Sequence, residues 1–286
     1  ADLVRRALAD TEGDILAFLP GAGEIGRVAG LLTGDVVVRP LHGSLPFERQ
    51  RAALAPEPDG RRRVVLATAI AETSLTVEGV RVVVDGGRAR RARTHPATGL
   101  SRLVTEPVSR AEADQRRGRA GRVAPGVCYR LWTKGEEGAL PAFAPPEILT
   151  ADLAPLALEL AVWGVDDPAG MAFADPPPAA ALAEARGLLA GLGALDAKGR
   201  TTEHGRAMAS FPGHPRLAHM MIVAECEGRA PEAALLAALL EERDPLRGAG
   251  ADIATRIAAV IDPAKARREH GVEPDRATVE RIRAEA

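Results

Sequence analysis

The sequence contains very few lysine, cysteine and aromatic residues. All but three of its 37 cationic residues are arginine, the exceptions being Lys134, Lys198 and Lys265. Its two cysteines, Cys128 and Cys226, lie far apart in the chain, which excludes a disulfide framework and cysteine-based metal-ligand spacing. Aromatic residues make up 3% of the chain, so base stacking cannot be the main source of affinity if the partner is a nucleic acid.

Two further absences concern targeting and membranes. No signal peptide opens the chain, and no apolar run approaches the roughly 20 residues needed to span a bilayer. We therefore expect a soluble, cytoplasmic protein. Its 286 residues, 46% of them hydrophobic, are enough for two or three domains with their own cores.

The charge is distributed unevenly along the chain. The formal net charge is −2, yet the stretch 88–122 contains ten arginines against three acidic residues. Such a basic stretch is expected where phosphates are held, although a solvated basic face would have the same composition.

Segments in the first half alternate between strand-like and helix-like patterns. We expect strands at 14–19, 35–39, 63–68, 81–85 and 126–132, and helices at 24–32 and 46–54. Ser109 and Glu112 form an S-x-x-E capping box, which predicts the start of a further helix. The alternation predicts an open, mostly parallel α/β sheet, in which ligands collect at the carboxyl ends of the strands.

After about Lys134 the pattern becomes helical. We expect helices at 148–162, 179–192, 215–227 and 231–242, and a tight hairpin at 195–200. A helix pair followed by such a hairpin is typical of a winged-helix domain. The tail beyond Asp262 is charged and weakly patterned, and we expect a truncated helix there.

Two motifs indicate phosphate chemistry. The segment 115–122 (QRRGRAGR) places Arg119 and Arg122 three residues apart, so on a helical turn both guanidinium groups can face one side. Such groups suit a transferring phosphoryl group, but a general phosphate-binding patch is the alternative. The segment 67–76 (ATAIAETSLT) crowds hydroxyls and backbone amides at the end of an expected strand, where phosphate oxygens bind, although Ser/Thr-rich turns are common in any protein.

Taken together, these motifs resemble the second motor lobe of the DEAH-box (DEAH/RHA) RNA helicases. The blocks ILAFLPGAGEI (15–25), LHGSLP (41–46), VVLATAIAETSLTVEGV (64–80) and QRRGRAGR (115–122) follow in the family's order. The similarity continues through PEILTADLAPLALELAVWGV (146–165) and LGALDAKGRTTEHGRAMASFPGHPRLAHM (192–220), and LLEERDPLRG (239–248) resembles the bacterial HrpB-type branch.

The resemblance implies both a fold and a division into domains. The fold is an α/β RecA-like lobe, with helices on both faces of a parallel sheet, followed by a winged-helix domain and an α-helical bundle. The implied boundaries are 1–134 for the lobe, 135–205 for the winged helix and 206–286 for an incomplete ratchet-like domain.

The resemblance also implies a nucleotide site and an RNA track. Arg119 and Arg122 would act as arginine fingers on the phosphates of ATP, and Gln115 would position the attacking water. The other nucleotide-side positions are Ser74, Thr76, Asp85 and Gly118. The positions that correspond to RNA contacts are Gly43, Thr68, Ala69, Arg88, Arg90, Arg91, Arg93 and Arg102.

Two positions depart from the family pattern. Relatives have Asn where this chain has Ala69, so one side-chain contact to RNA would be missing. Relatives often stack adenine on a Phe near the position of Leu54, and an aliphatic side chain there predicts that other NTPs also serve.

The sequence lacks the parts that would hold a triphosphate and Mg²⁺. None of the lysines follows a glycine, so there is no Gly-Lys-[Ser/Thr] loop, and there is no Asp-Glu dipeptide, so no DEAH box. We therefore expect a fragment that contains no metal site, whose partners are RNA and the first lobe of the same polypeptide. By itself it is expected to hydrolyse ATP negligibly.

Two other classes of function stay open. Gly21, Gly23 and Gly26 form a literal G-x-G-x-x-G after an expected strand, as in NAD-binding oxidoreductases, although Pro20 intrudes at the turn. A non-catalytic RNA-binding module is the other class, but such a module has no use for Gln115 beside the two arginines.

Overall fold

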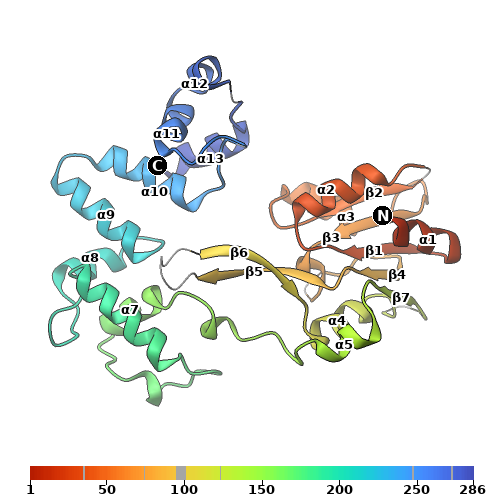
Figure 1. Cartoon of the computed structure of the whole chain (residues 1–286), viewed down its shortest axis with the longest axis horizontal. Coiled ribbons are helices and arrows are strands. Elements are labelled where there is room, and N and C mark those ends of the chain that lie inside the picture. Colours follow the sequence, from red (N-terminus) through yellow and green to blue (C-terminus); the bar gives the residue numbers. More distant parts are fainter. Residues whose placement is uncertain (35, 74, 95–100, 123, 247, 272) are drawn as a thin grey trace. The chain divides into compact units, whose positions relative to one another are not determined.

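The computed structural model describes residues 1–34, 36–73, 75–94, 101–122, 124–246, 248–271 and 273–286. The chain divides into two compact units, Ala1–Ala151 and Asp152–Ala286 (Figure 1). No helix within the described ranges has the length and apolar character required to cross a membrane.

A five-stranded parallel sheet forms the centre of the first unit (Figure 1). Its strands, in the spatial order β2-β3-β1-β4-β7, are β2 Val37–Leu41, β3 Arg63–Ala67, β1 Asp14–Phe18, β4 Val80–Asp85 and β7 Val127–Arg130. Ile15 of β1 lies between Val64 of β3 and Val82 of β4. Strands in this position are buried on both faces, which explains their runs of β-branched residues.

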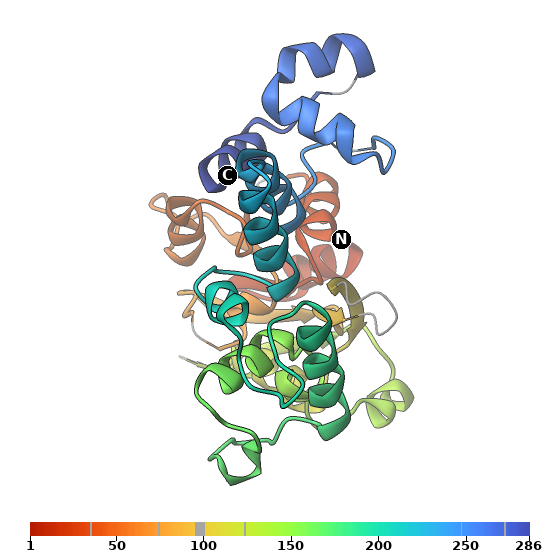
Figure 2. The same cartoon turned by 90° about the vertical axis from the view of Figure 1, so that its left-hand side faces the viewer.

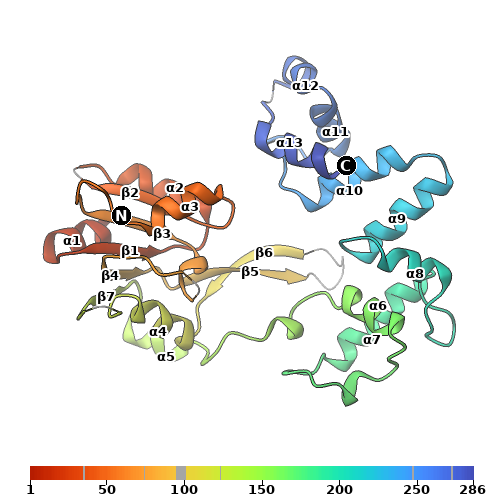
Figure 3. The ribbon, with the colours of Figure 1, turned by 180° about the vertical axis from the view of Figure 1, so that it is seen from behind.

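Helices cover both faces of this sheet (Figure 3). On one face, α1 (Asp2–Asp10) and α2 (Ala22–Leu31) pack against Ile15 and Ala17. On the other, α3 (Phe47–Leu54), the 3₁₀ helix η1 (Ala69–Ala71) and the residues after α4 (Arg110–Gly118) pack against Leu16 and Phe18. Successive side chains of β1 therefore enter opposite cores. This arrangement confirms the predicted α/β lobe with helices on both faces.

An antiparallel hairpin follows β4 and projects beyond the sheet (Figures 1 and 3). It pairs β5 (Arg88–Thr94) with β6 (Ser101–Pro107), in a register that places Arg91 opposite Val104. Two short helices, α5 (Lys134–Ala139) and η2 (Glu147–Leu149), complete the first unit. The sequence patterns did not predict α5.

The second unit is built from helices, coloured green to blue in Figure 2. They are α6 Ala154–Val162, η3 Pro168–Gly170, α7 Ala179–Gly191, α8 Glu203–Ala209, α9 Pro215–Cys226, α10 Ala230–Glu241, α11 Ile253–Ile261, α12 Pro263–His270 and α13 Arg276–Glu285. An isolated antiparallel bridge joins Leu195 to Thr201, where a tight hairpin was expected. The division of the chain into winged-helix and ratchet-like domains at 134 and 205 stays a prediction.

The start of α6 differs from the expected helix start at residue 148. The carboxylate Oδ1 of Asp152 accepts a hydrogen bond from the amide of Ala154 at 2.8 Å, and Pro155 lies in the first turn. A side-chain oxygen and a proline at these positions both favour a helix N-terminus. The segment 147–149 instead forms the separate 3₁₀ helix η2.

The expectation for the tail beyond Asp262 is wrong. Two helices, α12 and α13, form there, and α13 belongs to a buried core. Its Val279 and Ile282 pack with Ala238 and Leu239 of α10. The apolar positions of α13 are only three residues apart in an otherwise charged segment, so their burial depends on the partner helix rather than on an obvious hydrophobic run.

Candidate functional site

The carboxyl ends of the parallel strands β2, β3 and β4 bring predicted site residues to one edge of the sheet. Gly43 follows β2, Thr68 follows β3, and Asp85 is the last residue of β4. The amide of Thr68 donates a hydrogen bond to the carbonyl of Leu41 at 3.1 Å, which holds the exits of β2 and β3 together. The helix α4, which carries the first half of the QRRGRAGR motif, packs against β4.

The orientation of α4 is set by the predicted capping box, which is present. Ser109 Oγ accepts a hydrogen bond from the amide of Glu112 at 3.2 Å, and the Glu112 carboxylate accepts one from the amide of Ser109 at 2.6 Å. These bonds fix where the helix begins and therefore which side chains point inward. Arg116 is buried, whereas Gln115 and Gly118 are exposed.

Arg116 lies at the centre of a buried ion cluster. Its side chain is 1% exposed, and its Nη1 donates to Asp85 Oδ1 at 2.8 Å. Its Nε donates to Glu72 Oε1 at 2.7 Å, and its guanidinium carbon stands 4.9 Å from the ring centroid of Phe18. Arg116 Nη1 also donates to the carbonyl of Arg88 at 3.3 Å. One side chain thus joins α4 to the ends of β1 and β4, to the segment after β3 and to the hairpin.

Burial shifts the pKa values of this cluster. Desolvation raises the pKa of the Glu72 carboxyl above its ordinary value, and the attraction of Arg116 only partly opposes this shift. Desolvation also disfavours charged Arg116, but Asp85 and Glu72 outweigh it and raise the Arg116 pKa. Arg116 therefore stays charged and requires its two carboxylate partners.

Arg119 and Arg122 both reach the segment 72–76. Arg119, half-buried at the end of α4, donates to the carbonyl of Leu75 at 3.0 Å and to the carbonyl of Glu72. Arg122, which is exposed, donates to Thr76 Oγ1 at 2.6 Å. The prediction that both guanidinium groups face one side is consistent with these contacts. Ser74, which lies in this segment, falls outside the described residues.

Asp85 is fully buried, and its contacts are with this chain. Besides Arg116, its Oδ1 accepts a hydrogen bond from the amide of Gly87 at 2.9 Å. Its carboxylate therefore orders the turn between β4 and the hairpin. The predicted role of Asp85 at the nucleotide side stays a prediction.

The loop that contains Gly43 is held from inside by polar contacts. Gln50 of α3 donates to the carbonyl of Leu45 at 2.8 Å, and Ser44 Oγ lies 2.8 Å from His42 Nδ1. Gly43 itself is exposed, as is Ala69, whereas Thr68 is half-buried. These three predicted RNA positions therefore lie on strand exits where the backbone remains accessible.

The arginines of the hairpin fall into two groups. Arg88 and Arg102 are exposed, and Arg90 lies 3.2 Å from Glu24 of α2. Arg93 forms a bidentate ion pair with Glu106 within the hairpin. Its Nε donates to Oε1 at 2.8 Å, and its Nη2 donates to Oε2 at 2.6 Å. Arg91 pairs with Glu112 of α4 at 2.5 Å and lies 3.5 Å from Glu106. Three of the five predicted RNA-contacting arginines thus have acidic partners in this structure.

Arg116 and Glu72 were not among the predicted site residues. The sequence did contain a signal for Arg116, because Ala113 and Ala120 lie three residues before it and four after it, on the same side of the turn. A charged residue on an apolar helix face requires a buried partner of opposite charge. Which acidic residue supplies that partner depends on strand order, which the motif alone does not give.

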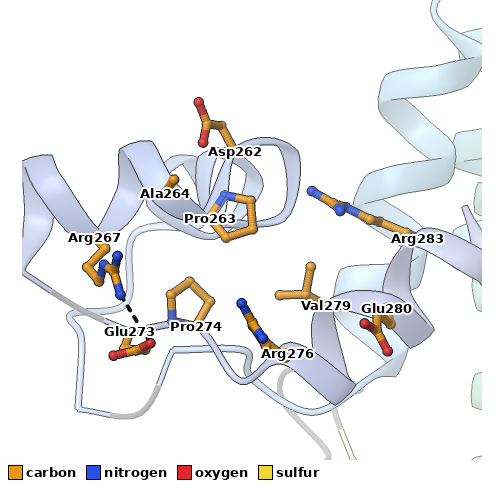
Figure 4. Close-up of a pocket in the computed structure, with 10 residues that line it drawn as sticks. All are labelled: Asp262, Pro263, Ala264, Arg267, Glu273, Pro274, Arg276, Val279, Glu280 and Arg283. Carbon is orange, nitrogen blue, oxygen red and sulfur yellow. Dashed lines mark hydrogen bonds and ion pairs between the residues drawn. The ribbon is translucent and has the colours of Figure 1, made fainter.

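A cavity of about 440 Å³ in the second unit has a mixed charge (Figure 4). The charged residues that line it are Asp262, Arg267, Glu273, Arg276, Glu280 and Arg283. Arg267 and Glu273 point toward each other and form an ion pair at 3.4 Å. With three cations and three acids, the cavity shows no excess of either charge that would select a ligand.

Three histidines of the second unit contact residues of that unit. His204 Nε2 and His219 Nδ1 are 2.8 Å apart, and His214 Nε2 lies 3.2 Å from Asp152 Oδ2. Among the described residues no group of three or more His, Cys, Asp or Glu side chains gathers in a way that could hold a metal ion.

With this geometry established, comparison with known proteins identifies the class. Residues 1–124 match the helicase conserved C-terminal domain. The chain is 47% identical over 239 residues to the ATP-dependent RNA helicase HrpB of Escherichia coli, covering 82% of this chain and 29% of that protein. It is 39% identical over 245 residues to the pre-mRNA-splicing factor ATP-dependent RNA helicase prp22 of Schizosaccharomyces pombe, covering 82% of this chain and 21% of the relative.

A solved structure supports the same assignment. The crystal structure of the Escherichia coli DEAH/RHA helicase HrpB matches all of this chain and 38% of its own, with a TM-score of 0.82 and 41% sequence identity. The lobe with its convergent arginines is therefore the C-terminal lobe of a helicase motor. The chain belongs to the DEAH-box helicases and is HrpB-like. It spans less than a third of the length of the curated relatives it matches.

The glycines that resembled a dinucleotide-binding fingerprint have another explanation in this lobe. Gly21 is the N-cap of α2, and a Cβ atom on it would lie 2.6 Å from the guanidinium of Arg90. The absence of a side chain at this turn lets the hairpin arginine lie against the start of α2. Since the surrounding lobe is that of a helicase, the NAD-binding alternative has no structural support.

Proposed function

We propose that this chain acts as the second motor lobe of an ATP-dependent RNA helicase that works in the cytoplasm. The observation that carries the proposal is the convergence of Arg119 and Arg122 on the segment 72–76, at the carboxyl edge of the sheet. ATP would bind between this edge and the first lobe of the same polypeptide, as the motif resemblance implies. The alternative is a passive RNA-binding lobe, which would not need two guanidinium groups at this position.

In the proposed site, Arg119 and Arg122 stabilise the charge that develops on the phosphoryl group as it is transferred. Gln115, exposed one residue before the buried Arg116, positions the attacking water. Thr76, the partner of Arg122, and Gly118 are further proposed nucleotide-side positions, as is Ser74, which falls outside the described residues. Asp85 orders the turn between β4 and the hairpin. Residue 54 is a leucine rather than an aromatic residue, so we also propose that the site accepts NTPs other than ATP.

The acidic residues of this edge do not fit a Mg²⁺ ion. Glu72 and Asp85 are both buried and both engaged by Arg116. A magnesium ion requires oxygen ligands together with several of its own waters, for which this buried cluster leaves no room. We therefore propose that the ion that accompanies ATP is held by the first lobe, while this lobe supplies positive charge and backbone groups.

The RNA track in this lobe is proposed to run along the strand exits and the hairpin. Gly43, Thr68 and Ala69 offer accessible backbone at the exits of β2 and β3. Arg88, Arg90 and Arg102 are exposed cations of the hairpin, and Arg90 keeps 37% of its side chain exposed beside Glu24. Contacts of this kind bind phosphates without reading the base sequence. Arg91 and Arg93, which were also expected to contact RNA, are engaged by carboxylates, so we do not include them in the track.

The test is RNA-stimulated ATP hydrolysis by the full-length parent. We expect Arg119→Ala and Arg122→Ala each to lower the stimulated rate by about three powers of ten, the scale of an arginine finger. Arg117→Ala is the matched control, because Arg117 belongs to the same motif but is exposed, and its ion pair within the described part of the chain is with Asp114, at 3.4 Å. This chain alone is expected to hydrolyse ATP negligibly.

Two results would contradict the proposal. If Arg119→Ala hydrolyses ATP as fast as the wild type, the finger assignment is wrong and the passive RNA-binding alternative gains support. If RNA does not stimulate the wild-type parent, the lobe does not belong to an RNA-dependent motor.

A further inference from the structure

The base of the hairpin is packed onto the helix that carries the arginine fingers. Ala89 of β5, Val108 and Ala113 of α4 form one buried cluster, against which Trp132 packs. Gly87, with φ +68°, lies so close to the Trp132 ring that a Cβ atom there would stand 2.8 Å from it. Since the interior of a protein is close-packed, hairpin base and α4 move together or not at all.

A polar contact extends this connection along β5. Arg91 Nη2 lies 2.5 Å from Glu112 Oε1, and both side chains are only 17% exposed. Glu112 is also the residue that closes the capping box of α4 with Ser109. Arg91 therefore attaches the hairpin to the first turn of α4, and the position of that turn fixes the rest of the helix.

The other end of α4 reaches the segment 72–76. Arg116 donates to the carbonyl of Arg88 in the hairpin and to Glu72. One turn further along, Arg119 donates to the carbonyls of Glu72 and Leu75. A nine-residue helix thus links the hairpin to the proposed nucleotide side, with hydrogen bonds near both of its ends.

We propose that Arg91 is a positioning residue that, through Glu112, couples the hairpin to the arginine fingers. The inference rests on the proposed function, because it concerns how RNA at the hairpin affects hydrolysis at the fingers. It gives Arg91 a role other than phosphate binding. Displacement of the hairpin by RNA shifts the first turn of α4, and the helix carries that shift to Arg119 and Arg122.

Arg93 provides a control for Arg91, because it has an ion pair but that pair does not join the hairpin to α4. Arg91 and Arg93 lie on the same face of β5 and both lie near Glu106. Arg93, however, has its ion pair within the hairpin, whereas Arg91 reaches α4. Replacing either arginine by glutamine removes one positive charge from the same surface, so a simple RNA contact predicts equal effects.

The experiment compares Arg91→Gln, Arg93→Gln and Glu112→Gln in the full-length parent, with a single-stranded RNA. It measures kcat at saturating RNA, the RNA concentration for half-maximal stimulation, and the RNA Kd. We expect Arg91→Gln to reduce the RNA stimulation of kcat about tenfold, within the range of allosteric coupling. Arg93→Gln is expected to keep the stimulation within about twofold, as for an ion pair near the surface.

Glu112→Gln guards against a merely structural effect, because an amide oxygen can still accept the capping hydrogen bonds of Ser109. We expect it to reproduce the loss of stimulation, and the double variant Arg91→Gln/Glu112→Gln to be no worse than either single one, as for partners in one interaction. We also expect the melting temperature of each variant to lie within a few degrees of that of the wild type.

Several outcomes would overturn the inference. If Arg91→Gln and Arg93→Gln raise the RNA Kd equally and keep the wild-type kcat at saturating RNA, Arg91 is an RNA contact and not a positioning residue. If Glu112→Gln keeps full stimulation, the link through α4 is not used. A wild-type parent without RNA stimulation would overturn the proposed function as well, which distinguishes that failure from the others.

Discussion

Replacement of Arg116 by methionine tests the buried ion cluster directly. Methionine has a similar length but no charge, so Arg116→Met leaves Asp85 and Glu72 buried without their cation. Asp85 is fully buried and Glu72 is 8% exposed. The second carboxylate oxygen of Asp85, Oδ2, has no hydrogen-bond partner among the described residues, so Arg116 is the only cation that offsets its charge there.

The expected loss of stability follows from that burial. Removing one partner of a buried ion pair costs about 3–5 kcal/mol, because the remaining charge is left uncompensated. Since Glu72 retains some contact with solvent, we expect the lower end of this range, about 3 kcal/mol. With a urea m-value of about 2 kcal/mol/M, the unfolding midpoint of the first unit should fall by about 1.5 M.

The assay is urea unfolding followed by the fluorescence of Trp132. A Trp163→Phe background removes the other tryptophan, which lies in the second unit and is 66% exposed. Arg117→Met is the control: its ion pair with Asp114 is exposed and 3.4 Å long, so the expected loss is below about 0.5 kcal/mol.

A triple variant separates the loss of charge from the loss of packing. In Arg116→Met/Glu72→Gln/Asp85→Asn no charge remains in the cluster, so at least half of the lost stability should return. The reasoning would be refuted if Arg116→Met were no less stable than Arg117→Met, or if the triple variant were as unstable as Arg116→Met.

Three further predictions concern other parts of the first unit and one surface thiol. Burial raises the pKa of Glu112, but its hydrogen bonds with Ser109 and Arg91 outweigh burial and hold the pKa below the ordinary value of 4.5. The ionised Glu112 carboxylate therefore stabilises the fold above about pH 4.5. This contribution is lost as the pH falls through the lowered pKa of Glu112 in the folded state. The Tm difference between wild type and Glu112→Gln should thus be positive at pH 7 and vanish in acid; a pH-independent difference would contradict this. Burial raises the pKa of the Cys128 thiol to about 11, so little of its reactive thiolate form is present at pH 8. Iodoacetamide at pH 8 should therefore modify the exposed Cys226 and leave Cys128 unmodified until urea unfolds the chain. Peptide mass spectrometry measures the modification of each cysteine. Gly126→Ala should destabilise the first unit by about 1–3 kcal/mol, because the added methyl group would collide with the backbone carbonyls of Ala120 and Arg81. Urea unfolding measures this loss. An unchanged unfolding midpoint would show that the start of β7 can shift without cost.

Much of the first unit could be predicted from the sequence because its signals are local. The β-branched runs, the strand–helix alternation and the Ser109–Glu112 capping box each reflect a preference of short segments. The structure has a strand or a helix at each of these places, with ends shifted by a few residues. The order of the motifs was also enough to indicate the helicase family, which the comparisons confirm.

The sequence was less informative where burial depends on a distant partner. In α13, Val279 and Ile282 are isolated apolar positions in a charged segment, and they become core residues only because α10 lies against them. The start of α6 at Ala154 goes with a local hydrogen bond from its amide to Asp152 and with Pro155 in the first turn, signals that the apolar pattern of 148–162 concealed. Helix propensity and composition do not contain either piece of information.

By itself the sequence determined the parallel α/β lobe, the helicase family and the segments that meet at the strand ends. Only the tertiary structure decided which charges pair. Arg116 lies in a motif that suggested a surface patch, but strand order brings Asp85 and Glu72 to it and buries all three. Arg91 and Arg93 are two residues apart and chemically identical, yet only Arg91 reaches α4. The physical reason is that an ion pair requires two atoms within a few ångströms, and that proximity is set by packing between elements far apart in the chain.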